Sequence, residues 1–442
     1  MKTVDPDYEN NPISNELYEE LSAAGLTDRT AVGVPASFIS SNTIGQQINC
    51  LLLWYEKNRR ILPWREDPTP YHVWISEIML QQTRVEAVKG YYARFLESLP
   101  DIAALAAADE DTYLKLWEGL GYYSRVRNLH KAAVVLMEDY GGQMPASAAD
   151  LRKLPGIGPY TAAAISSIAF GEPVPAIDGN LLRVFARLTC YEDSILTPQA
   201  RKDAEAFFGP LIELANAEHL GDDLVTFDAS PGAFNQALMD LGATICLPNA
   251  APLCNKCPLA AFCRAHAEGR ETELPNRPAK AKRTIEDITV FLIRFKGGIL
   301  LRKRPDTGLL ASLYEFPNVP GHLKKADALR TVEEMGFGPL RIRKLPPAKH
   351  IFTHKEWHMT AWEVFADEWT AFDRTAPERR TAEDPAPVQG AAAPADSVSA
   401  PADTQKEAAD DGRLFIADID AIRDVWSVPS AFAAYRDYLT GR

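Results

Sequence analysis

Residues 154–165 read LPGIGPYTAAAI, a turn with two glycines followed by the first residues of a helix. Gly156 and Gly158 allow the backbone to turn tightly, and the N–H groups at the start of a helix attract phosphate. Similar turns also join helices in proteins that bind no phosphate. The motif alone therefore leaves open whether this is a structural turn or a binding site.

A second unusual stretch, VPAIDGN (residues 174–180), follows that helix. Asp178 lies beside a glycine and precedes a further helix, which we predict over residues 181–188. An aspartate here is either an ordinary N-cap that stabilises the helix or a catalytic carboxylate. Because the glycine turn and a cysteine cluster accompany it, we favour a catalytic role for Asp178.

A single acidic residue, Glu77, interrupts the apolar stretch YHVWISEIMLQQ (residues 71–82). The stretch is typical of a helix, and the residues three and four positions from Glu77 include large apolar ones. Burial raises the pKa of a carboxyl group and makes it a proton donor near neutrality. The alternative is a glutamate on a solvent-facing side, but such a side would carry further charges, and only His72 could supply one.

Four of the six cysteines fall within residues 246–263. Four thiolates suit either tetrahedral zinc or an iron–sulfur cluster. Zinc ribbons usually contain two cysteine pairs separated by two residues, whereas this chain has one such pair. The spacing therefore favours iron–sulfur without excluding zinc. The four candidate ligands are Cys246, Cys254, Cys257 and Cys263.

The hydrophobic pattern changes along the chain from helical to strand-like. It is helical from residue 48 to about 270, and a β-hairpin is expected over residues 288–304, with further strands at 349–353 and 359–365. The expected segments are a poorly ordered extension (1–45), a helical domain (46–270), a linker (271–286), and an α/β domain (287–442) that contains a disordered insertion (367–411).

The net charge of −13 is concentrated in two of these segments. Residues 1–45 carry −5 and residues 367–411 carry −7, so the rest of the chain is nearly neutral and can still present basic clusters to phosphates. No apolar run is long enough to cross a membrane, and the N-terminus resembles neither a signal nor a transit peptide. We therefore expect a cytoplasmic protein.

Six motifs in order resemble those of the helix–hairpin–helix DNA glycosylase superfamily, and most closely its adenine DNA glycosylase branch, the MutY family. They are LPWR (62–65), VWISEIMLQQTRV (73–85), WEGLGYYSRVRNL (117–129), LPGIGPYTAAAI (154–165), IDGNLLRV (177–184) and PGAFNQALMDLG (231–242). The resemblance implies a mainly α, two-lobed glycosylase fold with an iron–sulfur loop, followed by a C-terminal α/β Nudix-like domain.

The resemblance also assigns roles to residues of this chain. Glu77 corresponds to the acid that protonates the departing adenine, at N7, and Asp178 to the carboxylate that stabilises the positively charged sugar or bonds to it transiently. Tyr160 and Asn180 would orient water and that carboxylate. The adenine pocket would be lined by Arg60, Leu62, Trp64, Arg65 and Gln236. DNA contacts would come from Leu80, Gln82, Thr83, Leu120, Tyr122, Gly156 and Gly158, with Leu80, Gln82 and Tyr122 filling the vacated stack.

The C-terminal part resembles the Nudix-like domain of the same family through GLLASLYEFPN (308–318) and HIFTHKEWHM (350–359). A Nudix hydrolase needs a dense set of glutamates for Mg²⁺, and here only the sequence EEMG (333–336) remains, so we expect no pyrophosphatase activity. In the family this domain recognises the oxidised guanine through a Phe-Ser-His loop. Phe352, Thr353 and His354 match that loop, with threonine in place of serine.

One position separates the hydrolytic branch from the endonuclease III-like lyases, which carry a lysine where this chain has Tyr160. The resemblance therefore implies a monofunctional glycosylase that removes adenine opposite 8-oxoguanine or guanine in double-stranded DNA and leaves an abasic site. It also implies one [4Fe–4S] cluster, although the first cysteine spacing is seven residues here and six in the family. We expect a monomer associated with the bacterial nucleoid, with the insertion as a possible site for a repair-protein partner.

Two other functions compete with this interpretation. An endonuclease III-like glycosylase and lyase acting on oxidised pyrimidines would need an amine in place of Tyr160. A non-catalytic DNA-binding protein could keep the fold, but it would have no need for both Glu77 and Asp178.

Overall fold

The computed structural model describes residues 41–215, 229–248, 251–278, 282–370 and 414–441. The described residues form two compact units, one within residues 1–92 and 135–279 and the other within residues 93–134 and 280–442. The predicted insertion lies almost wholly outside the described residues, as does most of the predicted N-terminal extension. None of the described helices is both long and apolar enough to cross a membrane.

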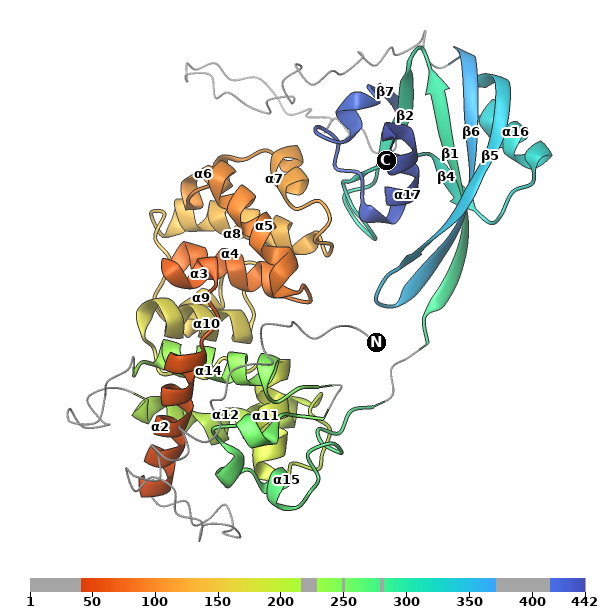
Figure 1. Ribbon diagram of the computed structural model, residues 1–442. Helices are drawn as coiled ribbons and strands as arrows, with labels where there is room; N and C mark the ends of the chain where they lie inside the picture. The colour runs from red at the N-terminus through yellow and green to blue at the C-terminus, as the bar shows by residue number, and fades with distance from the viewer. Residues whose placement is uncertain (1–40, 216–228, 249–250, 279–281, 371–413, 442) are drawn as a thin grey trace, which may run out of the picture. The chain divides into compact units, whose positions relative to one another are not determined.

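The first unit is helical (Figure 1). Its first helix, α2, begins at Ser41, so it extends into the predicted 1–45 segment. The helices of this unit are α2 (Ser41–Asn58), α3 (Pro63–Glu66), α4 (Pro70–Leu80), α9 (Ala148–Leu151), α10 (Pro159–Phe170), α11 (Gly179–Thr189), α12 (Pro198–Leu214), α14 (Pro231–Thr244) and α15 (Arg264–Ala267). Two more helices, α5 (Val85–Ser98) and α8 (Ser124–Asp139), contain residues assigned to both units.

Helix α10 follows the two-glycine turn and has sequence signals at both ends. Pro159 occupies its first turn, where a missing N–H costs nothing, and Gly171 ends it in the left-handed conformation with φ of 75°. Gly156 in the turn also has a positive φ, of 76°. Only glycine adopts such angles readily, which explains the residue choice at both places.

The core of the first unit lies between α2, α11, α12 and α14. Fully buried side chains from all four helices meet there, including Leu51, Leu181, Phe208 and Phe234. Helix α10 packs against α4 and α14, and α14 also packs against α11. These contacts place the residues of α4, α10 and the start of α11 around one region.

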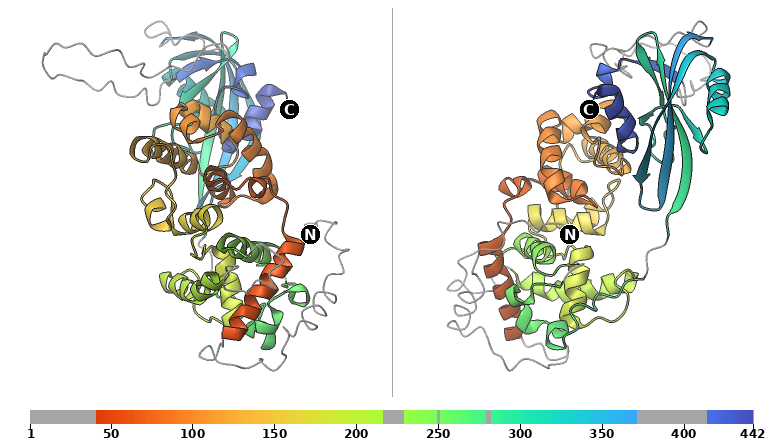
Figure 2. Two further views of the ribbon diagram at one scale, coloured as in Figure 1. Left: turned by 90° about the vertical axis from the view of Figure 1, so that its left-hand side faces the viewer. Right: turned by 45° about the vertical axis from the view of Figure 1, so that its right-hand side comes forward.

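The second unit contains a sheet in the order β3-β2-β1-β6-β5, in which β4 also pairs with β1 and β7 with β2. The strands β1 and β6 are parallel, and the other pairs are antiparallel. The strands are β1 (Thr284–Phe295), β2 (Gly298–Lys303), β3 (Tyr314–Glu315), β4 (Asn318–Pro320), β5 (Phe337–Ile351), β6 (Lys355–Trp369) and β7 (Leu414–Ala417). Helix α16 (Lys325–Glu334) and helix α17 (Ala433–Thr440) cover opposite faces of the sheet (Figure 2).

The strands are longer than the sequence pattern predicts. Strand β5 begins at Phe337, well before the predicted strand at residue 349, and contains Pro339, Pro346 and Pro347. Proline is rare in strands because it has no N–H group to donate to a neighbouring strand. Strand β5 lies at the edge of the sheet, where proline is tolerated. Strand β1 begins within the predicted linker, at Thr284.

Residues 93–134 contain helices α6 (Ile102–Ala107) and α7 (Glu110–Leu116), and polar contacts join this segment to the C-terminal sheet domain. The Tyr314 hydroxyl donates to Asp111 at 3.1 Å, and Arg436 forms an ion pair with Glu118 at 2.5 Å. Lys115 Nζ donates to the carbonyl of Trp426 at 2.9 Å. These contacts join residues that lie far apart in the sequence and belong to the same compact unit.

Because α14 packs closely on α10, we expect a larger residue at Gly232 to lower the stability of the fold. A Cβ atom on Gly232 would lie 2.9 Å from Ile168 Cα and 3.0 Å from the Ser167 carbonyl oxygen. We expect Gly232→Ala to lower the free energy of unfolding by about 1–3 kcal/mol through overpacking. The control is Gly209→Ala in α12, where an added Cβ would meet open space. This substitution should not lower the free energy of unfolding, because alanine reduces the conformational freedom of the unfolded chain. Denaturant unfolding of both variants checks this, and equal stabilities would contradict it.

Candidate active site

A cavity of about 820 Å³ in the first unit is lined by residues from α3, α4, the two-glycine turn, the start of α11, α12 and α14. All the predicted catalytic and adenine-pocket residues line it, as do five of the predicted DNA contacts. These are Glu77, Tyr160, Asp178, Asn180, Arg60, Leu62, Trp64, Arg65, Gln236, Leu80, Gln82, Thr83, Gly156 and Gly158. The structure thus brings together residues that lie far apart in the sequence.

Glu77 is buried on α4, where only 6% of its surface is exposed. The hydroxyl of Tyr160, at the start of α10, donates a hydrogen bond to Glu77 Oε2 at 2.5 Å. Burial raises the pKa of Glu77 to about 7; the bond from Tyr160 and the charge of Arg65 oppose the rise, and the charge of Asp178 adds to it. Glu77 can therefore carry a proton near neutral pH.

Asp178 is the N-cap of α11 and lines the cavity at the same time. Its Oδ1 accepts from the backbone N–H groups of Asn180 at 2.8 Å and Leu181 at 2.7 Å, and its Oδ2 accepts from Asn180 Nδ2 at 2.8 Å. Burial raises the pKa of Asp178, while these three donors lower it. The two interpretations of Asp178, as a helix cap and as a cavity-lining carboxylate, are compatible.

Two arginines and a glutamine form another wall of the cavity. Arg60 and Arg65 both pair with Asp240 of α14, with closest approaches of 2.6 Å and 2.8 Å. The Arg65 guanidinium also lies over the ring of Tyr55, 5.6 Å from its centroid, and the Tyr55 hydroxyl donates to Gln236 Oε1 at 3.3 Å. This wall is rich in hydrogen-bond donors.

Sequence reasoning missed two polar residues of this region. Asp240 forms ion pairs with both arginines of this wall. It is the only acid in the motif PGAFNQALMDLG, just as Glu77 is the only acid in its apolar helix, so the same sequence signal was available. Arg201 on α12 lines the cavity, and its Nη1 donates to the carbonyl of Ile177 at 2.6 Å, directly before Asp178. No sequence signal distinguished Arg201 from an exposed helical arginine.

Two of the predicted DNA contacts have unusual backbone conformations. Gln82 has φ of 59° and Tyr122 has φ of 49°, although neither is a glycine. Such left-handed residues are disfavoured for L-amino acids and often mark functional sites. Tyr122 is also 45% exposed, which is unusual for so large a ring.

The remaining predicted DNA contacts belong to the second unit. Phe352, Thr353 and His354 form the turn between β5 and β6, and the Thr353 side chain shares a hydrogen bond with the Tyr122 hydroxyl. Leu120 is buried. The structure therefore brings Tyr122 and the β5–β6 turn together within this unit.

The four cysteines of residues 246–263 line one small cavity. Arg187 Nη1 donates to Cys246 Sγ at 3.1 Å, and the Arg187 carbonyl accepts from Cys263 Sγ at 3.3 Å. Four thiols that line one space form a donor set that suits a soft metal or an iron–sulfur cluster. The residues therefore fit the cluster that the sequence predicts.

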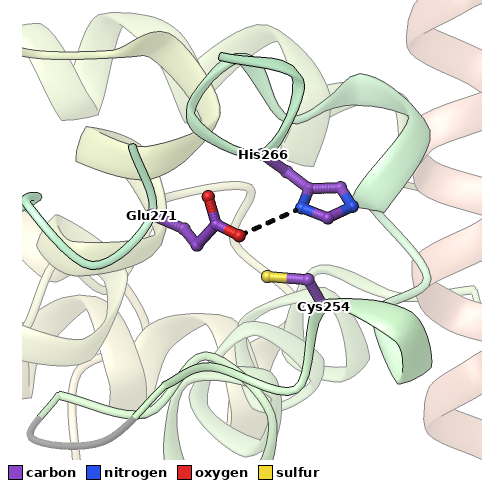
Figure 3. A group of neighbouring side chains, drawn as sticks. All are labelled: Cys254, His266 and Glu271. Atoms are coloured by element: carbon purple, nitrogen blue, oxygen red, sulfur yellow. Dashed lines mark hydrogen bonds and ion pairs between the residues drawn. The ribbon is translucent and has the colours of Figure 1, made fainter. Parts of the chain in front are cut away.

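Cys254 also belongs to a second possible ligand group. Its Sγ, a nitrogen of His266 and a carboxylate oxygen of Glu271 all lie within 4.8 Å of one another, and the three side chains point into a common space (Figure 3). His266 Nδ1 lies 3.3 Å from Glu271 Oε1. A mixed set of this kind suits a single ion such as zinc, so the geometry alone does not choose between the two kinds of metal site.

An arginine connects the cysteine loop with the cavity. Arg183 Nε donates to the carbonyl of Cys246 at 2.7 Å, and its Nη2 donates to Asn180 Oδ1 at 2.9 Å and to the Gly242 carbonyl at 2.6 Å. Because Asn180 in turn donates to Asp178, a continuous set of hydrogen bonds joins the loop to the cavity.

Comparisons with known proteins identify the family of this chain. A family model described as the HhH-GPD superfamily base excision DNA repair protein matches residues 75–210, and a NUDIX domain model matches residues 289–398. The adenine DNA glycosylase of Mus musculus is 35% identical over 387 residues, which cover 74% of this chain and 72% of the mouse protein. That of Buchnera aphidicola subsp. Schizaphis graminum is 35% identical over 312 residues, which cover 70% of this chain and 84% of that protein.

Among solved structures, a thermostable thymine-DNA glycosylase is 28% identical and covers 52% of this chain and 99% of its own, with a TM-score of 0.42. The two family models match the helical part and the C-terminal part of the chain, in line with the fold predicted from the sequence. The chain belongs to the adenine DNA glycosylase family, within the HhH-GPD superfamily of base excision DNA repair proteins.

Proposed function

We propose that this protein is a monofunctional adenine DNA glycosylase, which hydrolyses the N-glycosidic bond of adenine opposite 8-oxoguanine or guanine in double-stranded DNA and leaves an abasic site. One observation carries the proposal: Glu77 and Asp178, two carboxyl groups with different hydrogen-bond partners, line the same cavity. Family membership supports the choice of adenine as the base.

Glu77 acts as the general acid. Cleavage of an N-glycosidic bond leaves negative charge on the departing base, and a proton delivered to N7 of adenine neutralises that charge. The Tyr160 hydroxyl, whose own pKa is raised by burial and by Glu77, remains protonated and holds the glutamate side chain in place. A pKa of about 7 allows Glu77 to give up its proton at physiological pH.

Asp178 acts in its ionised form on the sugar. Burial raises the pKa of Asp178, but three N–H donors oppose that rise and stabilise its negative charge. The positive charge that develops on the sugar as the base departs is stabilised by this carboxylate. Asn180, held by Arg183, fixes the orientation of the carboxylate and of the attacking water.

The remaining predicted residues bind the DNA. Arg60, Leu62, Trp64, Arg65 and Gln236 surround the extruded adenine. Gly156 and Gly158 approach the DNA backbone, while Leu80, Gln82, Thr83, Leu120 and Tyr122 act beside the opposite base. The bond between Tyr122 and Thr353 supports a shared role for Tyr122 and the Phe352–His354 turn in recognising an oxidised guanine.

A [4Fe–4S] cluster is proposed at Cys246, Cys254, Cys257 and Cys263, which line one cavity. When bound, such a cluster supplies four iron–thiolate bonds that cross-link the loop. Arg187 donates to Cys246 Sγ and would hold the side chain of that ligand in place. His266 and Glu271 would then lie beside the cluster rather than hold a separate ion.

Two substitutions test the assignment of the carboxyl groups. Glu77→Gln keeps the shape but removes the proton, and Asp178→Asn can keep the helix cap but removes the negative charge. We expect each to lower the single-turnover rate of adenine release by about 10²-fold or more. The control is Glu86→Gln on α5, whose carboxylate is exposed in an ion pair with Lys89. Full activity in either catalytic variant would refute the assignment.

The pKa of Glu77 predicts the pH dependence. Because the protonated form is active and its pKa is about 7, the single-turnover rate should fall by about tenfold per pH unit well above pH 7. At low pH the rate should fall again as Asp178 becomes protonated. Adenine release measured from about pH 5 to pH 9 checks this bell shape. A rate that rises steadily with pH would exclude an acid at Glu77.

The reaction product distinguishes a hydrolase from a lyase. None of the described residues that line the cavity is a lysine, so no amine is positioned to attack the sugar. We expect adenine release from a duplex with adenine opposite 8-oxoguanine to leave the strand intact until alkali is added. Borohydride should trap no protein–DNA adduct, whereas an endonuclease III-like lyase under the same conditions provides the positive control.

A further inference from the structure

Asp240 is a fully buried acid that none of the proposed steps uses. It lies on α14 with no exposed surface, and two arginines satisfy both of its carboxylate oxygens. Arg65 donates through Nη1 to Oδ2 at 2.8 Å and through Nη2 to Oδ1 at 2.9 Å, a bidentate pair. Arg60 donates through its backbone N–H to Oδ2 at 3.1 Å and through Nε to Oδ1 at 2.7 Å.

These bonds fix the wall of the cavity in two ways. The bidentate pair sets the plane of the Arg65 guanidinium, because such a fork tolerates little rotation. The bond to the Arg60 backbone fixes the chain directly before α3, and Arg65 Nη1 also donates to the Arg60 carbonyl at 3.2 Å. Asp240 therefore holds two cavity-lining residues that lie 175 and 180 positions away in the sequence.

Asp240 also sets the charge of this wall. Two guanidinium groups and one carboxylate leave one net positive charge. Burial by itself would raise the pKa of Asp240, but the bonds and charges of Arg65 and Arg60 outweigh it and hold that pKa below its usual value. Asp240 is therefore ionised throughout the pH range in which Glu77 titrates.

We propose that Asp240 is a positioning residue for adenine excision, which fixes the donor wall formed by Arg60 and Arg65 and reduces its positive charge so that Glu77 keeps its proton. The inference rests on the proposed function of Glu77 as the general acid. Guanidinium N–H groups fixed in this way fit the ring-nitrogen acceptors of adenine and oppose a base that presents an N–H at the same place, such as guanine.

The effect on Glu77 follows from the charged groups around it. Tyr160 of α10 donates to it, Asp178 at the start of α11 repels its ionised form, and Arg65 of α3 attracts that form. Asp240 is directly bonded to Arg65 and offsets part of its field. Loss of the Asp240 charge would leave Arg65 uncompensated and would lower the pKa of Glu77. Less of the enzyme would then hold the proton at neutral pH.

The test compares Asp240→Asn and Asp240→Glu with the unmodified protein in single-turnover adenine release over a range of pH. For Asp240→Asn we expect a rate at least about tenfold lower near pH 7.5, with the alkaline limb of the profile moved to lower pH by about half a unit or more. Asp240→Glu keeps the charge and should keep the alkaline limb in place, even where its longer side chain lowers the rate.

If Asp240→Asn lowered the rate equally at every pH and left the alkaline limb of the pH profile in place, Asp240 would only maintain the fold. A limb that moves to higher pH would also overturn the inference. Adenine release by the unmodified protein is measured first, because its absence would refute the proposed function rather than the role of Asp240.

A second pair of variants decides the matter if Asp240→Asn fails to fold, as removal of one partner from a buried ion pair can cause. Arg65→Gln removes the positive charge nearest to Glu77, so its alkaline limb should move to higher pH. Arg65→Lys retains the charge and should leave the limb in place, although it loses the bidentate geometry. Superimposable profiles for Arg65→Gln and Arg65→Lys would refute the electrostatic role of this wall.

Discussion

Helix α10 contacts both α4 and α14, and this packing determines how the site is assembled. The contact with α4 buries Glu77 and brings the Tyr160 hydroxyl to it, while α14 carries Asp240 towards the arginines before and within α3. The same α14 packs against α11, whose first turn holds Asp178. A cavity with several ionisable groups is thus a result of how four helices pack.

The ionisable groups of this cavity are stabilised by different means. Burial favours the neutral form of Glu77, although its hydroxyl donor, Tyr160, works against that preference. Asp178 has the N–H groups of a helix start, and Asp240 has two guanidinium groups. This region therefore holds Glu77, whose pKa is raised, and Asp240, whose pKa is lowered, so that carboxyl groups of opposite protonation preference occur close together.

Local sequence signals predicted much of the fold and of the site. Glu77 was identified because an acid inside an apolar helix is conspicuous, and Asp178 because a glycine-flanked aspartate opens a helix. Asp240 gave the same signal as Glu77, but its partners lie far away in the sequence, and no local pattern indicates such a pairing. The role of Arg201 depends on one carbonyl that only the folded chain brings near it. The length of β5 was underestimated because its prolines are compatible with a strand only at the edge of a sheet, and the sequence does not reveal which strand lies at the edge.

Gln82 and Tyr122 illustrate a conflict between folding and activity. A chain selected for stability alone would place glycine or asparagine at both left-handed positions, since other residues lose about 1 kcal/mol or more there. Glycine would remove both side chains that the proposed function assigns to the DNA, whereas asparagine would shorten the amide of Gln82 and remove the ring of Tyr122. The protein thus retains two locally unfavourable residues whose side chains serve the proposed DNA contacts.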